Sequence, residues 1–105
     1  MYTTISKIER LEILNVGYTN ISDISFLENN KNIKKLNLSG CQNIKDFTTI
    51  SKLERLEILN VGNTNISNIS FLDKNKNIKE LRLNCCKNIN KNDNIFNRKD
   101  IFISK

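Results

Sequence analysis

The sequence predicts an α/β solenoid in which short parallel strands form a sheet on one side and 3₁₀ turns or loops cover the other. A nine-residue pattern occurs four times, with apolar residues at its first, fourth and sixth places, and the apolar spacing behind each copy changes to three residues. Self-similarity at a fixed period is the signature of a repeat architecture. The nonamers, which begin 22 or 23 residues apart, are LEILNVGYT at 11–19, IKKLNLSGC at 33–41, LEILNVGNT at 56–64 and IKELRLNCC at 78–86.

Each nonamer contains a short strand with one buried face. In the first copy, Leu14 and Val16 alternate with other residues, and alternation of this kind is typical of a half-buried strand. Behind the strand, Ile21, Ile24 and Leu27 are three residues apart, which suits a single 3₁₀ turn better than a long α-helix. Such a unit cannot bury its apolar side alone, so we expect the copies to stack with parallel strands side by side.

A larger period lies above the small one. The segment Ser6–Ile50 aligns with Ser51–Ile95, and most of the aligned residues are identical. The duplicated unit is therefore a pair of repeats, one ending its nonamer in Thr and the other in Cys. We expect a single domain over residues 1–105, with a partial repeat at 1–10, repeats beginning at 11, 33, 56 and 78, and a short terminal strand near 101–103 in which Ser104 stands where a leucine belongs.

The four nonamers match the motif LxxLxLxx(N/C/T)x(I/L), and from Ile8 to about Ile95 the chain resembles leucine-rich repeat proteins. The short period is similar to the internalin-like and SDS22-like subtypes. Alternation of Thr and Cys at the ninth place also resembles repeat proteins of trypanosomes and of insect poxviruses. The family usually has Asn there, whose amide bonds the backbone of neighbouring turns, whereas hydroxyl and thiol groups can form only part of that ladder. The ninth places are Thr19, Cys41, Thr64 and Cys86.

Composition limits the classes of function. The net charge of +6 and the pI near 9.4 would suit an acidic partner, a membrane surface or nucleic acid. However, the lysines are spread through the repeat joints and are not interleaved with aromatic residues, as single-strand binders require. Three cysteines are an odd number, which argues against a disulfide framework. The first ten residues contain no continuous apolar stretch, and nothing in the sequence approaches the ~18 apolar residues of a membrane span. We therefore expect no secretory signal, no membrane span and a cytoplasmic protein.

The sequence predicts no enzyme, no cofactor and no metal site. It contains no histidine, which is the commonest acid/base residue and zinc ligand. Cys41 and Cys86 should act as small apolar residues inside the stack, while Cys85 should lie at the edge of the strand face. Adjacent Cys85 and Cys86 cannot readily share a metal, since neighbouring strand residues point to opposite faces. Gly17, Gly40 and Gly62 should serve repeat turns.

The resemblance implies that the third, fifth, seventh and eighth places of each nonamer point outward onto a concave sheet face. We expect Ile13, Tyr18 and Ile58 to be exposed there among amides and small residues, as a modest apolar anchor with polar surroundings. The candidate protein-binding residues on this concave face are Ile13, Asn15, Tyr18, Lys35, Asn37, Ile58, Asn60, Asn63, Glu80 and Arg82.

These observations favour a non-enzymatic module that binds a protein partner of unknown identity through the sheet face. If the similarity to insect poxvirus proteins holds, it implies a viral protein that engages a host factor. Two alternatives stay open. One is a basic binder of nucleic acid or acidic surfaces, and the other is a homodimer formed through the solenoid ends or an edge strand such as Ile101–Ile103.

Overall fold

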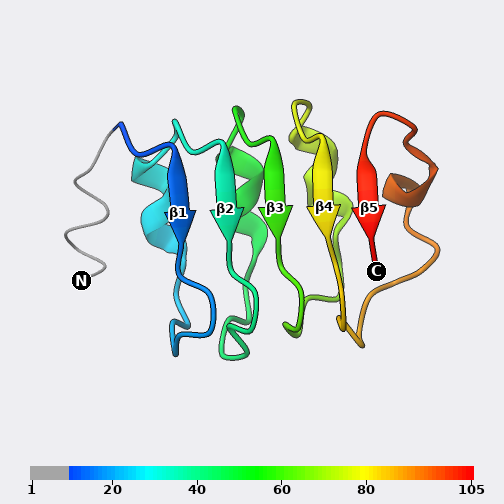
Figure 1. The fold of residues 1–105 in the computed structure, drawn as a ribbon, viewed down its shortest axis with the longest axis horizontal. Helices are drawn as coiled ribbons and strands as arrows, with labels where there is room; N and C mark the ends of the chain where they lie inside the picture. The colour runs from blue at the N-terminus through cyan, green and yellow to red at the C-terminus, as the bar shows by residue number, and fades with distance from the viewer. Residues whose placement is uncertain (1–9) are drawn as a thin grey trace.

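The computed structural model describes residues 10–105, and in this part of the chain five parallel strands form one sheet in the order β1-β2-β3-β4-β5 (Figure 1). The predicted partial repeat at 1–10 lies outside the described residues apart from Arg10. Each strand is three residues long, and a 3₁₀ turn follows each of the first four. In chain order the elements are β1 Ile13–Asn15, η1 Ser25–Asn29, β2 Lys35–Asn37, η2 Thr48–Lys52, β3 Ile58–Asn60, η3 Ser70–Lys74, β4 Glu80–Arg82, η4 Asn94–Asn97 and β5 Phe102–Ser104.

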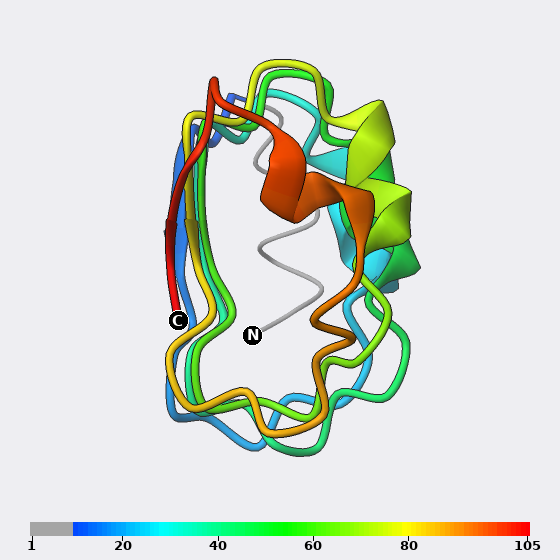
Figure 2. The same cartoon turned by 90° about the vertical axis from the view of Figure 1, so that its right-hand side faces the viewer.

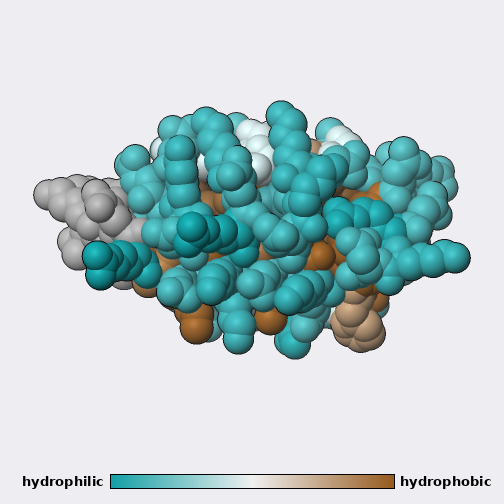
Figure 3. All heavy atoms as spheres, turned by 90° about the horizontal axis from the view of Figure 1, so that it is seen from above, coloured by the Kyte–Doolittle hydropathy of each residue, from teal (hydrophilic) through white to brown (hydrophobic). Residues whose placement is uncertain are grey.

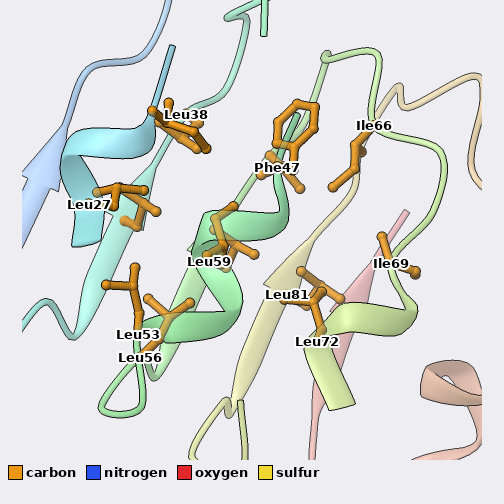
Figure 4. Packing of buried hydrophobic residues seen from close by; sticks show 14 of the residues in the cluster. Leu27, Leu38, Phe47, Leu53, Leu56, Leu59, Ile66, Ile69, Leu72 and Leu81 are labelled. Atoms are coloured by element: carbon orange, nitrogen blue, oxygen red, sulfur yellow. The ribbon is translucent and has the colours of Figure 1, made fainter. Parts of the chain in front are cut away.

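The fold has two layers, with the sheet on one side and the 3₁₀ turns on the other (Figure 2). Leu59 at the centre of β3 is fully buried, as are Leu56 before the strand and Val61 after it. Figure 4 shows side chains such as Leu59, Phe47 and Leu72 filling the space between the layers. The predicted solenoid with parallel strands and 3₁₀ turns is confirmed, because the period of two buries one strand face and the period of three buries one side of each turn.

Polar side chains fix the start of each 3₁₀ turn. Asp46 Oδ1 accepts hydrogen bonds from Thr48 N at 2.9 Å and from Thr48 Oγ1 at 2.6 Å, which lowers the pKa of the Asp46 carboxyl. Asp23 Oδ1 likewise accepts from Ser25 N at 2.8 Å, and its pKa is lowered. Asn68 takes the same place in the third repeat and accepts from Ser70 N. A side-chain acceptor two residues before a backbone N–H forms a local turn that competes with a longer α-helix.

The ninth places form a ladder that is closed within each two-repeat unit. Thr19 Oγ1 and Cys41 Sγ both donate to the carbonyl of Val16, at 2.8 and 3.1 Å, and lie 3.7 Å from each other. Thr64 and Cys86 repeat this arrangement on the carbonyl of Val61, at 2.7 and 3.0 Å. Among residues 10–105 no such bond joins Cys41 to Thr64. Hydroxyl and thiol thus replace the usual amide in pairs, which explains why Thr and Cys alternate.

A buried amide that the sequence did not single out joins two neighbouring repeats. Asn75 is fully buried, and its Nδ2 donates to the carbonyls of Ile50 and Leu53 in the preceding repeat, both at 3.0 Å. Its Oδ1 has no hydrogen-bond partner in the described structure. Asn is so frequent in this chain that a buried copy carries no sequence signal.

The terminal strand lies one residue further along than predicted. Glu80 pairs with Phe102 and Leu81 pairs with Ile103, so Ile103, not Ser104, takes the leucine place. The first place of this repeat is held by Asp100, which accepts from Arg98 Nη2 at 2.8 Å, and this bond lowers the pKa of the Asp100 carboxyl. The missing first leucine is the reason that the pattern alone sets the wrong frame.

Candidate functional site

The outward residues of the strands form rows across the sheet, as the register predicts. The first row follows the third places of the nonamers and adds one residue from β5, whereas the second row follows the fifth places. We call this outward side of the five strands the sheet face. Its first row is Ile13, Lys35, Ile58, Glu80 and Phe102, and its second row is Asn15, Asn37, Asn60, Arg82 and Ser104.

Exposure along the first row differs from the prediction at two positions. Ile13 on the edge strand β1 is 61 % exposed, as expected, but Ile58 is only half-exposed because Lys35 and Glu80 flank it on neighbouring strands. The expectation that Ile58 stands exposed is therefore wrong. Phe102, which the sequence reading missed, is 67 % exposed at the opposite edge. Reading Ile103 instead of Ser104 at the leucine place would have put Phe102 in this row.

The asparagines of the second row also support the turns below the strands. Asn15 Oδ1 accepts from Gly17 N at 3.0 Å, Asn37 Oδ1 from Ser39 N at 2.9 Å, and Asn60 Oδ1 from Gly62 N at 3.0 Å. The Nδ2 groups of these three side chains form no hydrogen bond with residues 10–105. The row therefore has a structural role through its oxygens and presents amide donors on the sheet face.

A shallow hollow of about 220 Å³ lies on the sheet face across β1 to β4. Lys35 forms no ion pair with any carboxylate of the described residues, whereas Arg82 Nε donates to Glu80 Oε2. The uncompensated charge on this hollow is thus that of Lys35. Tyr18, Asn63 and Glu80 are predicted site residues that do not line it. Those that do are Ile13, Asn15, Lys35, Asn37, Ile58, Asn60 and Arg82, together with Leu14 and Leu36.

The lower margin of the sheet face consists of residues in the left-handed backbone conformation. Tyr18, Gly40, Asn63 and Cys85 occupy the eighth places with φ of 57°, 72°, 54° and 62°. Among the glycines predicted to serve turns, only Gly40 has this conformation. The Tyr18 ring lies directly over Gly40, because a Cβ on that glycine would stand 2.3 Å from Tyr18 Cδ1. Tyr18 is nevertheless 73 % exposed, so it presents an aromatic platform at this margin.

The cysteines lie in three different environments. Cys41 is buried, Cys86 is half-buried at its ladder place, and Cys85 is exposed at the margin. Within residues 10–105 no group of three or more Cys, Asp or Glu side chains is placed to hold a metal ion. The same residues include no helix that is both long and apolar enough to cross a membrane.

Comparison with known proteins identifies what this architecture is similar to. The family profile described as Leucine Rich repeats (2 copies) matches residues 9–52. An internalin, InlF, of Listeria monocytogenes is 27 % identical with a TM-score of 0.84 over 94 % of this chain and 29 % of its own. Internalin C2 of the same organism is 26 % identical with a TM-score of 0.81, over 98 % of this chain and 45 % of its own.

A leucine-rich repeat protein of Leptospira interrogans shares the fold at 21 % identity, with a TM-score of 0.79 over 96 % of this chain and 27 % of its own. The present chain therefore spans less than half the length of each of these structures. No curated protein matches the sequence.

Proposed function

Because the chain is a leucine-rich repeat protein, we propose that it is a non-enzymatic module that binds another protein through the sheet face. The observation that carries the proposal is the hollow across β1 to β4, in which an unpaired cation lies beside apolar side chains. The face also presents an exposed aromatic ring at its margin and amide donors along its second row. This combination of apolar anchors and a polar surround is typical of binding surfaces.

The charge of the hollow predicts the chemistry of the partner. Lys35 lies in register between Ile13 and Ile58, on the strands to either side. A partner segment that fits this row presents a carboxylate to Lys35 and apolar side chains to the two isoleucines. The Glu80–Arg82 ion pair is already satisfied, so it contributes more to orientation than to affinity.

The width of the sheet limits the partner further. Five strands about 4.8 Å apart give a platform only about 19 Å across. That width accommodates one extended segment or one helix, which is about 10 Å in diameter. We therefore expect a single segment of the partner to occupy the hollow. Tyr18 and Phe102, at the two ends of the face, should contact the parts of the partner next to that segment.

Selection of random linear peptides on the purified chain tests the proposal. We expect enriched peptides with an acidic residue between aliphatic ones, and affinities reduced about tenfold or more by Ile58→Asp and by Lys35→Glu, as for a central hot-spot residue. Lys35→Glu should shift the selection towards basic peptides. Lys45→Glu is the matched control, because it makes the same charge change at an exposed residue that lies outside the hollow. Selected peptides that bind Ile58→Asp and Lys35→Glu with the same affinity as the original chain would overturn the proposal.

Three narrower statements stay predictions from the sequence. They are that the partner is a host protein engaged by a viral one, that two copies pair through an end or edge strand, and that the protein works in the cytoplasm. Light scattering over a range of concentrations tests the second, since a dimer dissociates on dilution and a monomer keeps its mass.

A further inference from the structure

A second hollow lies on the upper rim, away from the sheet face. Its volume is about 500 Å³, and residues from three successive repeats line it. Figure 3 shows this rim from above as a largely hydrophilic surface, with apolar groups mainly along the edge of the sheet. Four cationic side chains and one carboxylate line the hollow: Lys31, Lys52, Arg55, Lys74 and Glu54.

Most of the positive charge around the hollow is uncompensated. Lys52 pairs with Glu28 at 2.6 Å, but Lys31, Arg55 and Lys74 form no ion pair with the carboxylates of residues 10–105. Lys52 and Lys74 end η2 and η3, where cations favour the last carbonyls of a helix. That explanation does not extend to Lys31 and Arg55, which lie in the turns leading to β2 and β3. Like charges gathered around one hollow repel each other unless an anion binds between them.

We propose that this hollow binds a ligand with two or more phosphate groups, either a free polyphosphate ester or the phosphorylated headgroup of a lipid. A phosphate monoester carries close to two negative charges and three acceptor oxygens, which matches several cations around one hollow better than a single carboxylate does. Arg55 supplies the forked donor that binds phosphate through two parallel hydrogen bonds. The volume lies within the range of about 300–1,000 Å³ for small-molecule sites, so the hollow holds more than one phosphate. This site is separate from the protein-binding face proposed above and does not depend on it.

The duplication of the chain provides a matched control for the test. Lys76 is the counterpart of Lys31 in the second two-repeat unit and is also exposed, but it does not line the hollow. Lys31→Gln and Lys76→Gln therefore remove the same charge from equivalent turns. Only the first should affect a bound ligand. The charged side chains that line the hollow are cationic except Glu54. Because the Glu54 carboxylate repels a bound anion, Glu54→Gln should strengthen binding.

Titration calorimetry with inorganic tripolyphosphate measures these effects, and circular dichroism confirms that each variant is folded. We expect Arg55→Gln and Lys31→Gln to weaken binding about tenfold each, as for the loss of a charge-assisted hydrogen bond. Lys76→Gln should change the affinity less than about twofold, which is the long-range effect of an exposed charge screened by salt. Absence of binding, or equal losses from Lys31→Gln and Lys76→Gln, would overturn the site.

Vesicles distinguish the two sources of the phosphate. The chain is mixed with phosphatidylcholine vesicles that contain a phosphatidylinositol bisphosphate. If it co-sediments with them and Arg55→Gln abolishes this, the ligand is a lipid headgroup. Tripolyphosphate binding without co-sedimentation assigns it to a free polyphosphate ester. If the chain binds single-stranded DNA and Lys31→Gln and Lys76→Gln reduce that affinity equally, the rim is a general basic surface and the proposal is overturned.

Discussion

Substitution of Gly40 by alanine tests the Tyr18 platform, because two separate costs can be worked out from the structure. Alanine at φ +72° pays about 1–2 kcal/mol for the left-handed conformation. Its Cβ would also lie 2.3 Å from Tyr18 Cδ1, so the ring must leave its place. Tyr18 is 73 % exposed, so roughly a quarter of a side chain of about 200 Å² loses its contact, which costs about 1 kcal/mol at 25 cal/mol per Å².

We therefore expect Gly40→Ala to lower the free energy of unfolding by about 2–3 kcal/mol in urea denaturation followed by circular dichroism. In a Tyr18→Ala background only the backbone cost remains, so the double-mutant cycle should give a coupling of about 1 kcal/mol. Gly17→Ala is the control, since that glycine lacks a positive φ and its Cβ would meet no atom closer than 3.2 Å. A coupling near zero would show that the ring does not rest on Gly40 and would refute the platform.

Two further predictions concern the scaffold. Asn75→Ala removes two buried hydrogen bonds and should cost about 2–3 kcal/mol in urea denaturation. Asn77→Ala removes one exposed bond to the Glu54 carbonyl and should cost less than about 1 kcal/mol. Equal losses would contradict the role of Asn75 as a link between neighbouring repeats. The folded pKa values of Asp23 and Asp46 lie below the ordinary 3.8, so the stability they contribute is present above that value and is lost as the pH falls through the lowered values. Asp46→Asn copies the uncharged Asn68 of the third repeat, so its melting temperature should fall less than that of the original chain as the pH is lowered through this range. An equal fall in both proteins would exclude the Asp46 carboxylate as a cause of the acid destabilisation.

The rows of the sheet face were predictable because they follow from the backbone alone. Once Leu14 is inward, Ile13 and Asn15 must point outward, and a constant repeat length aligns them with Lys35 and Asn37. Exposure was less predictable, because it depends on the neighbours of each strand. Ile13 and Ile58 occupy the same place in the repeat, yet only the one on the edge strand is largely exposed.

Two other features carried no sequence signal. The upper-rim hollow combines residues from the turns of three successive repeats, and neither Lys31 nor Arg55 stands out in a lysine-rich chain. The left-handed eighth place was hidden because Tyr18, Asn63 and Cys85 occupy it as well as Gly40. Such a position is recognised from sequence only when glycine recurs there.

The differences between the two halves of the chain also bear on the binding proposed for the sheet face. Within the nonamers, the halves differ only at outward places. Packing explains this restriction, since inward residues contact both neighbouring repeats and tolerate little change. The sheet face has therefore diverged between the two halves, whereas the buried residues of the nonamers have not. Glu80 in the second half occupies the place of Lys35 in the first. Opposite charges at equivalent places of the two halves distinguish the two directions of a bound segment, so we expect the proposed partner, with its carboxylate at Lys35, to dock in one orientation. Differences between the halves occur at Tyr18 and Asn63, Lys35 and Glu80, Asn37 and Arg82, Ser39 and Asn84, and Gly40 and Cys85.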